Sequence, residues 1–578
     1  MVKLVRRKEN KSLALPDSLS PLLKRIYRQR KLNSAAELEL GLANLISPDS
    51  MKGMDDACNL LMQALSDQSR LLIVADYDAD GATSCALSML ALRQMGAAHV
   101  DYLVPNRFEF GYGLTPEIIE LAMPRKPDLI ITVDNGISST AGVAAAQAAG
   151  IKVLITDHHL APEVLPSADA IVNPNQPGCN FASKCIAGVG VIFYVMLALR
   201  SRLRKAGWFE SGQLAEPNLA QLLDLVALGT VADVVAMDRN NRILVNEGLK
   251  RIRAASCRSG ILELGKVAKR NCPQLTSMDL AFGLGPRLNA AGRLNDMSVG
   301  IECLMANEQS KAEALANQLH NMNEDRRQIE SEMKVQAQQV LEEMNLEAEK
   351  LPSALCLYDK RWHQGVIGIL ASRVTEQYHR PVIAFARADE EGSQLKGSAR
   401  SVKGFHIRDA IDSVACRHSG LITKFGGHAM AAGLSLDKNN LKEFEEAFCA
   451  EAERLLGTTP LHACVESDGP VPANEMTIQS AETLRYAGPW GQGFPQPVFN
   501  DYFISRQMKW IKDKHLRMKL SPCSDPNLKV DAIAFNLNPE QGPTDNCVYL
   551  HLVFRLDINE YRNTSKLQLL VEHVLGFC

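Results

Sequence analysis

Between residues 71 and 157 the chain alternates short apolar runs with alanine-rich stretches, in the order LLIVA, ATSCALSMLALRQMG, HVDYLV, PDLIITVD, TAGVAAAQAAG and KVLITD. Apolar runs of this length that alternate with helical stretches predict βαβ units and a parallel sheet. An acidic residue stands where three of the apolar strands end, at Asp76 after LLIVA, at Asp134 and at Asp157. Because open parallel sheets bind ligands at the carboxyl ends of their strands, we expect these acids to converge.

The length of 578 residues predicts several domains, since a single core stops growing at roughly 250–300 residues. Strong helix formers almost without Gly or Pro predict one long helix near residues 305–345, and a second α/β pattern follows it. The last part has short strand-like runs separated by turns, typical of a small β-barrel or sandwich, with an OB-fold as one candidate. The expected fold class is multidomain α/β, divided into an N-terminal segment (1–50), a parallel-sheet catalytic domain (51–305), a linking helix (306–349), a smaller α/β domain (350–457) and an OB-like β domain (458–578).

Composition narrows the class of protein. The 63 Lys and Arg are balanced by 66 Asp and Glu, so any DNA-binding charge must be concentrated in a groove. Fourteen cysteines without a CxxC pair predict neither a zinc site nor a disulfide framework, which suits a reducing cytosol. The N-terminus lacks the apolar region of a signal peptide, and the apolar run 187–199 is shorter than the ~20 residues of a membrane span. We expect that run to be a buried helix.

The segment DYDADG at 76–81 is the sharpest local signal, because three carboxylates at alternate positions can surround a hard divalent cation. A calcium-binding EF-hand is excluded, since its twelfth position is Leu87 rather than Glu. The structural alternative is an acidic turn that caps a helix at Ala82.

Further candidates are Asp157-His158-His159, Asp134 before an Asn-Gly turn, and Asp233 inside an apolar run. Taken singly, each has a structural alternative: a packed histidine pair, a strand-ending turn and a helix N-cap, respectively. Together they offer oxygen and nitrogen ligands for two metals, which can drive an in-line phosphoryl displacement. The ligand candidates are Asp76, Asp78, Asp80, Asp134, His158 and Asp233.

In order and approximate spacing, the motifs DYDADG, TVDNG, TDHH and GTVADVV resemble those of the DHH phosphoesterase superfamily. The segments GVIGILASR, KGSARSVKGFHIRDAI and KFGGHAMAAG are similar to its companion DHHA1 domain. AFGLGPRLNAAGRLNDMSVGIEC and AGPWGQGFPQPVF resemble the RecJ family within it. The resemblance covers the chain from about residue 50 to its end.

The resemblance implies a metal-dependent 5′ to 3′ exonuclease that hydrolyses single-stranded DNA to 5′-mononucleotides in recombination and repair. It implies two divalent ions, Mn²⁺ or Mg²⁺, with Asp76 and His159 supporting the site or contacting the phosphate. It also implies a cytoplasmic monomer that works with a single-strand-binding protein and a DNA helicase, without a membrane. The implied direct metal ligands are Asp78, Asp80, Asp134, His158 and Asp233.

Substrate contacts are expected from hydroxyl, guanidinium and bare backbone groups. Ser398 and Arg400 suit a terminal phosphate, and the turn Gly426-Gly427-His428 is expected to line the cleft. Arg107, Arg287 and Arg293 are candidates for backbone phosphates, with surface or interdomain salt bridges as the alternative. Aromatic side chains that either stack on bases or pack in a core are Tyr112, Trp362, Phe405, Trp490, Phe494 and Trp510.

Two other functions compete with this interpretation. A related DHH phosphodiesterase would act on cyclic dinucleotides, very short RNA or polyphosphate with the same metals. A non-catalytic DNA-binding scaffold would have lost metal ligands, yet every ligand candidate is intact. An ATP-driven motor is excluded because the chain contains no G-x-x-x-x-G-K-[ST] motif.

Overall fold

The computed structural model describes residues 3–106, 113–210, 214–343, 352–389, 391–418, 420–457, 464–512, 514–537, 539, 542–544, 547–561 and 564–578. The chain divides into two compact units. One comprises Met1–Lys3 with Asn321–Val465, and the other comprises Leu4–His320 with Glu466–Cys578. We refer to them as the small unit and the large unit. The division falls within the long helix α13 (Gln309–Glu343).

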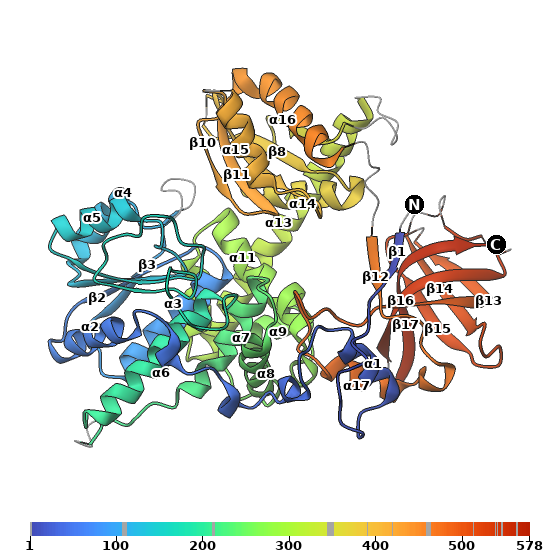
Figure 1. Ribbon diagram of the computed structural model, residues 1–578, viewed down its shortest axis with the longest axis horizontal. Helices are drawn as coiled ribbons and strands as arrows, with labels where there is room; N and C mark the ends of the chain where they lie inside the picture. Colours follow the sequence, from blue (N-terminus) through green and yellow to red (C-terminus); the bar gives the residue numbers. More distant parts are fainter. Residues whose placement is uncertain are drawn as a thin grey trace. The chain divides into compact units, whose positions relative to one another are not determined.

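A parallel sheet of five strands organises the first part of the large unit (Figure 1). Strand β2 is buried along its whole length, as its unbroken apolar run predicts for a strand covered on both faces. Every neighbouring pair in this sheet is parallel, and the order is β3-β2-β4-β5-β6. The strands are β2 (Leu71–Ala75), β3 (Val100–Leu103), β4 (Leu129–Val133), β5 (Lys152–Thr156) and β6 (Ala170–Val172).

Helices cover both faces of this sheet (Figure 1). Leu72 and Val74 of β2 pack with Ile118 and Val143 in a core beneath α4 (Pro116–Ala122) and α5 (Thr140–Ala148). On the other face α3 packs against α6, whose apolar first half forms the expected buried helix. The helices of that face are α2 (Met54–Ser66), α3 (Ala79–Gln94) and α6 (Gly188–Lys205).

A helical segment follows the sheet within the large unit. Helix α7 packs on α3 and α6, which brings the end of α7 to the carboxyl edge of the sheet. The helices of this segment are α7 (Leu223–Ala232), α8 (Arg239–Arg253), α9 (Ser259–Val267), α10 (Ser277–Asp279), α11 (Gly285–Leu294) and α12 (Ser298–Met305), with a π-helical turn at Leu280–Leu284 before α11.

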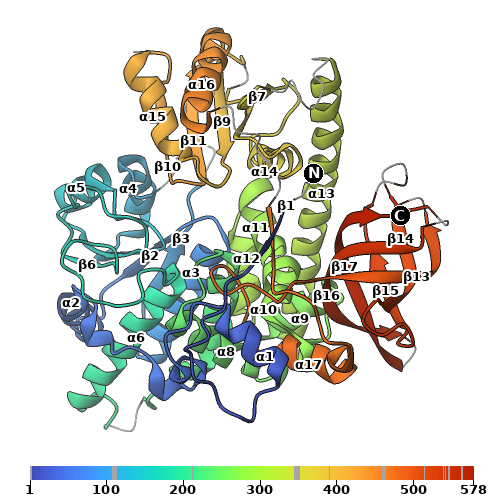
Figure 2. The ribbon, with the colours of Figure 1, turned by 45° about the vertical axis from the view of Figure 1, so that its right-hand side comes forward.

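The last strands of the large unit form a closed barrel in the order β13-β14-β15-β17-β16, which resolves the choice between barrel and sandwich (Figure 2). Closure depends on β15 and β17, which pair in parallel. Helix α17 (Ile478–Tyr486) packs on β16. The strands are β13 (Phe499–Ile511), β14 (His515–Pro522), β15 (Val530–Ala534), β16 (Tyr549–Tyr561) and β17 (Thr564–Phe577).

A buried ion pair ties the N-terminal segment to the segment before the barrel. Both nitrogens of the Arg30 fork donate to the Asp468 carboxylate, at 2.6 and 3.0 Å, and both side chains are fully buried. Arg7 adds a third bond to the same carboxylate at 3.0 Å. The segment that contributes these arginines also forms β1 (Lys3–Arg6), which pairs with β12 (Cys464–Ser467), and α1 (Pro21–Arg28).

The small unit is built on a mixed sheet in the order β10-β11-β9-β8-β7, in which only β7 and β8 are parallel. Its core includes Phe385, Phe444 and Phe448, whose rings contact one another. The strands are β7 (Leu355–Tyr358), β8 (Val382–Arg387), β9 (Gln394–Arg400), β10 (Lys424–Gly427) and β11 (Ala431–Asp437). The helices are α14 (Ile367–Tyr378), α15 (Ile407–Arg417) and α16 (Leu441–Leu456).

The mixed α/β class and the C-terminal barrel that the sequence predicts are confirmed. The division into five segments with the boundaries given above stays a prediction. Among the described helices, none combines the length and apolar character that a membrane span requires.

Candidate metal centre

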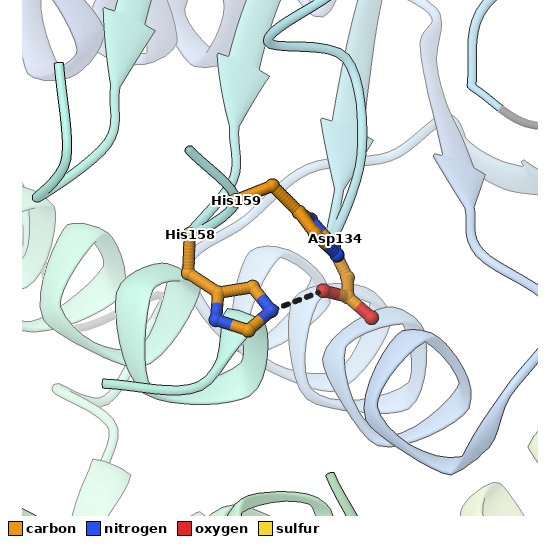
Figure 3. Close-up of side chains that lie close together, drawn as sticks. All are labelled: Asp134, His158 and His159. Carbon is orange, nitrogen blue, oxygen red and sulfur yellow. Dashed lines mark ion pairs between the residues drawn. The ribbon is translucent and has the colours of Figure 1, made fainter. Parts of the chain in front are cut away.

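Acidic and histidine side chains meet at the carboxyl edge of the parallel sheet. Asp76 follows β2, Asp134 follows β4, and His158 follows β5. Asp233 reaches the same place from the end of α7, where it is the C-cap residue rather than the N-cap considered from the sequence. Figure 3 shows the imidazole of His158 directed at the carboxylate of Asp134, with His159 beside them.

The distances suit shared cation binding. Nε2 of His158 lies 3.1 Å from Oδ1 of Asp134, 3.5 Å from Oδ2 of Asp233 and 4.0 Å from Oδ2 of Asp80. In a second group, Asp76, Asp78 and Asp134 each offer an oxygen within 4.8 Å of the others. Because Asp134 belongs to both neighbourhoods, the cluster can hold two cations that share a carboxylate.

The buried negative charge of this cluster would be stabilised by a bound cation. Asp80 is fully buried, and burial together with the charge of Asp78 raises its pKa to about 7. Burial and the neighbouring carboxylates raise the pKa values of Asp134 and Asp233 well above the usual range. Oδ2 of Asp233 is buried and accepts no hydrogen bond from the described residues. Such carboxylates are stable as anions beside a metal, so the donor set fits a hard divalent ion.

The backbone holds Asp80 in a fixed orientation. Its two carboxylate oxygens accept hydrogen bonds from the amides of Gly188 (2.6 Å) and Val189 (2.9 Å) at the N-terminus of α6. A helix N-terminus stabilises negative charge. Gly188 is required by space, because a Cβ there would lie 2.7 Å from the carboxylate of Asp134.

Asp78 has a capping role as well as a place in the cluster. Its Oδ1 accepts the amides of Asp80 and Gly81, which makes it the N-cap of α3. The helix therefore begins at Ala79, ahead of the Ala82 start considered for the capping alternative. Capping and metal binding are compatible, because the other carboxylate oxygen of Asp78 is not used in the cap.

Asp157 was expected to converge with the other acids, but its role was not predicted. Its Oδ1 accepts hydrogen bonds from the amides of His158 and His159 and contacts Nδ1 of His159 at 2.7 Å. Burial alone would raise the pKa of Asp157. The hydrogen bond to His159 and the positive charge of His159 outweigh burial, so the pKa of Asp157 is lowered. Burial opposes the charge on His159, yet the same bond raises the pKa of His159 to about 9. The signal that could have shown this role is the pair itself, an acid two residues before a histidine.

The arginines expected to bind phosphates differ in their surroundings. Arg287 is buried, and its guanidinium donates to the carbonyl oxygens of Gly283 (2.5 Å) and Val267 (3.4 Å). Arg293 is half-buried in the last turn of α11. Arg107, together with the candidate stacking residue Tyr112, lies outside the described residues.

In the small unit, Ser398 and Arg400 lie together on β9. Nη1 of Arg400 donates to Oγ of Ser398 at 3.2 Å, and its Nε donates to Oγ of Ser372 at 3.1 Å. Both groups lie beside Gly368 in the first turn of α14, where a Cβ would be 2.9 Å from Oγ of Ser398. A guanidinium, a hydroxyl and a helix start are groups that bind phosphate.

Gly426 and Gly427 end β10, His428 begins the connection to β11, and all three residues are exposed. The amide of His428 donates to the carbonyl of Ala431, which pairs with Arg400 on β9. The structure thus places Gly426 and Gly427 in the same sheet as the Ser398–Arg400 pair, with β11 between β10 and β9.

Several aromatic candidates pack in cores. Trp362 is 4% exposed and donates to Gln336 of α13, and Phe405 packs edge-on against Phe448. Trp490 is buried and stacks on Phe494 with a ring separation of 5.1 Å. Trp510 is half-buried on β13. For the four buried rings, core packing explains their position.

Family models match the chain in three places. The N-terminal domain of the DHH family matches residues 70–230, the DHHA1 domain matches residues 351–454, and the RecJ OB domain matches residues 467–573. The fold and the acidic cluster thus define a protein of the DHH class that also carries DHHA1 and OB domains.

Curated relatives match over almost the whole length. The single-stranded-DNA-specific exonuclease RecJ of Dickeya dadantii is 50% identical, and that of Escherichia coli is 48% identical, over 99% of each chain. The crystal structure of RecJ with Mn²⁺ from Thermus thermophilus superposes with a TM-score of 0.80 at 27% identity, covering 100% of this chain and 80% of that one. The chain belongs to the RecJ family.

Proposed function

We propose that the chain is a metal-dependent exonuclease that hydrolyses single-stranded DNA from its 5′ end and releases 5′-mononucleotides. The observation that carries this proposal is the buried cluster of carboxylates around His158 in a chain about half identical to single-stranded-DNA-specific exonucleases. The site needs no serine, cysteine or lysine nucleophile, because its donor set suits metal-activated water.

The cofactors are Mn²⁺ or Mg²⁺, the ions named for the Thermus thermophilus crystal structures. We assign Asp78, Asp80, Asp134, His158 and Asp233 as direct ligands and Asp76 and His159 as supporting residues. When bound, the ions lower the pKa of a coordinated water and neutralise the charge of the reacting phosphate.

The chain's own residues hold this arrangement and position the phosphate. The amides of Gly188 and Val189 fix Asp80, and Asp157 fixes the ring of His159. Because Nδ1 of His159 is bonded to Asp157, its other ring nitrogen suits a non-bridging phosphate oxygen.

Polarity of digestion is assigned to the small unit. A 5′-terminal phosphate carries more charge than an internal one, and Ser398 with Arg400 offers a fork and a hydroxyl that distinguish the two. The exposed Gly426-Gly427-His428 segment of the same sheet adds backbone amides and an imidazole for the same strand of DNA.

The barrel extends the DNA path in this proposal. Leu516, Met518 and Leu520 of β14 point inward, so the alternating Arg517 and Lys519 are exposed on its outer face. Lys509 of β13 is exposed and pairs in register with Arg517. None of the three cations forms an ion pair within the described residues, so they are available to phosphates.

The cellular setting is also a proposal. By family membership we place the protein in the cytoplasm as a monomer in recombination and repair, supplied with strands by a helicase and a single-strand-binding protein. The alternatives are a related phosphodiesterase for cyclic dinucleotides or short oligonucleotides and a non-catalytic scaffold, both weakened by the full-length match to RecJ.

The test incubates the protein and Mn²⁺ with single strands labelled at either end, a blunt duplex and a cyclic dinucleotide. Release of nucleotides from the 5′ end of the single strand alone supports the proposal. Cleavage of the dinucleotide with an intact single strand would assign a sister activity, and no turnover in any substrate would favour the scaffold.

A further inference from the structure

The first turn of α3 carries two of the assigned ligands, Asp78 and Asp80. The first amides of a helix have no partner within it. Asp78 accepts the amides of Asp80 and Gly81. The amide of Ala79, between the two ligands, donates to Oδ1 of Asn289 on α11 at 2.8 Å. The peptide that joins the ligands is thus held from a helix far along the chain.

Helix α11 also approaches this loop at a second point. Gly292 follows Asn289 by one helical turn, so both lie on one face of α11. A Cβ at Gly292 would overlap the carbonyl oxygen of Tyr77, between Asp76 and Asp78. The loop that bears the carboxylates is therefore in contact with α11 on both sides of Asp78.

We propose that Asn289 is a positioning residue of the metal centre: by accepting the Ala79 amide, its side-chain oxygen fixes the carboxylates of Asp78 and Asp80 for metal binding. The inference rests on the ligand set assigned under the proposed function. Loss of a group that orients a metal ligand without touching the metal typically weakens metal affinity by about 10- to 100-fold.

The experiment measures Mn²⁺ binding to the metal-free full-length protein by calorimetry. Asn289→Ala is expected to weaken Mn²⁺ affinity about 10- to 100-fold and to raise the Mn²⁺ concentration needed for half-maximal activity. Asn289→Asp keeps an acceptor oxygen and is expected to bind within about 3-fold of the parent protein. Asn289→Ser, which is polar but too short, is expected to behave like Asn289→Ala and serves if the alanine variant does not fold.

Ser277→Ala is the matched control. It removes another buried hydrogen bond between distant parts of the large unit, from Ser277 Oγ to the carbonyl of Trp490 at 2.6 Å. It is expected to lower the melting temperature and leave Mn²⁺ affinity unchanged. A purely stabilising role for Asn289 predicts the same pattern for both positions.

The outcomes separate this inference from the ligand assignment. Parental Mn²⁺ affinity in Asn289→Ala, equal losses in Ser277→Ala, or no recovery in Asn289→Asp would each overturn the inference while leaving the ligands in place. Full Mn²⁺ binding by Asp134→Ala would instead overturn the ligand set and this inference together.

Discussion

His158 and Asp134 lie at the ends of two neighbouring parallel strands, and Nε2 of the histidine stands 3.1 Å from Oδ1 of the aspartate. The contact forms just beyond the strands. Asp134 directly follows β4 and adopts a left-handed backbone with φ of 63°, and His158 is the second residue after β5.

Asp134→Asn tests the shared ligand. Asparagine tolerates the left-handed backbone, so the fold is kept. We expect activity to fall by about 10³-fold or more, since metal charge contributes several kcal/mol to such reactions. Because a buried, repelled carboxylate is removed, the metal-free protein should melt about 2–5 °C higher. Mn²⁺ should no longer raise the melting temperature, and Asp169→Asn, near the other end of β5, should behave like the parent protein.

Gly188→Ala tests the close approach of α6 to the site. The added methyl group meets the Asp134 carboxylate, so Mn²⁺ affinity should fall at least about 10-fold, with a loss of ~1–3 kcal/mol in stability from overpacking. Gly41→Ala is the control, because a Cβ there meets nothing within 4 Å. Unchanged Mn²⁺ binding in Gly188→Ala would contradict the packing described for this ligand.

Arg400→Lys tests recognition of the 5′ end. A lysine keeps the charge but loses the planar fork, so the preference for a 5′-phosphorylated strand over a 5′-hydroxyl strand should fall about 10-fold or more. The measurement is the ratio of kcat/KM on the two strands. Equal losses on both strands would show that Arg400 supports the fold of the small unit rather than the terminal phosphate.

Charge reversal at Lys509, Arg517 and Lys519 tests the outer face of the barrel. Each lost phosphate contact should reduce the salt dependence of single-strand binding by roughly 0.7 in the slope of log affinity against log salt. Turnover of a strand too short to reach the barrel should stay at the parental level. A long strand that binds with parental affinity and salt slope would refute the proposed path.

Glu451 of the small unit provides a test of pH dependence. The carboxylate of Glu451 accepts a hydrogen bond from Arg454. Together with the contributions of Ser413 and Arg417, this bond outweighs the effect of burial and lowers the pKa of Glu451 from 4.5 to about 2. A depressed pKa stabilises the fold above about pH 4.5, and this contribution is lost as pH falls toward 2. Since both arginines are half-exposed, Glu451→Gln should cost only ~1 kcal/mol at pH 7.

Thermal melting of both proteins from pH 7 to pH 3.5 measures that contribution. The difference in melting temperature should be constant down to about pH 5 and shrink below it. A difference that is constant down to pH 3.5 would mean that the ion pairs do not stabilise the folded state.

The sequence predicts the convergence of Asp76, Asp134 and His158, because strand direction alone brings them to one edge of a parallel sheet. It does not predict the bond between Asn289 and Ala79, since a contact across 210 residues depends on how α11 packs. The sequence also does not predict that the barrel closes, because closure requires β15 and β17 to pair in parallel although β16 lies between them in the sequence. The sequence does not decide whether Trp362 and Phe405 pack in a core or stack on a DNA base, because an aromatic ring suits both environments.

The buried pair of Arg30 and Asp468 imposes an order on biosynthesis. A ribosome delivers Asp468 438 residues after Arg30. Until then the guanidinium has no carboxylate to meet and must stay in water, because burying it alone would be costly. The segment that carries Arg30 therefore settles only after Asp468 has been made, and we expect a nascent chain that stops before Asp468 to expose that segment to proteases.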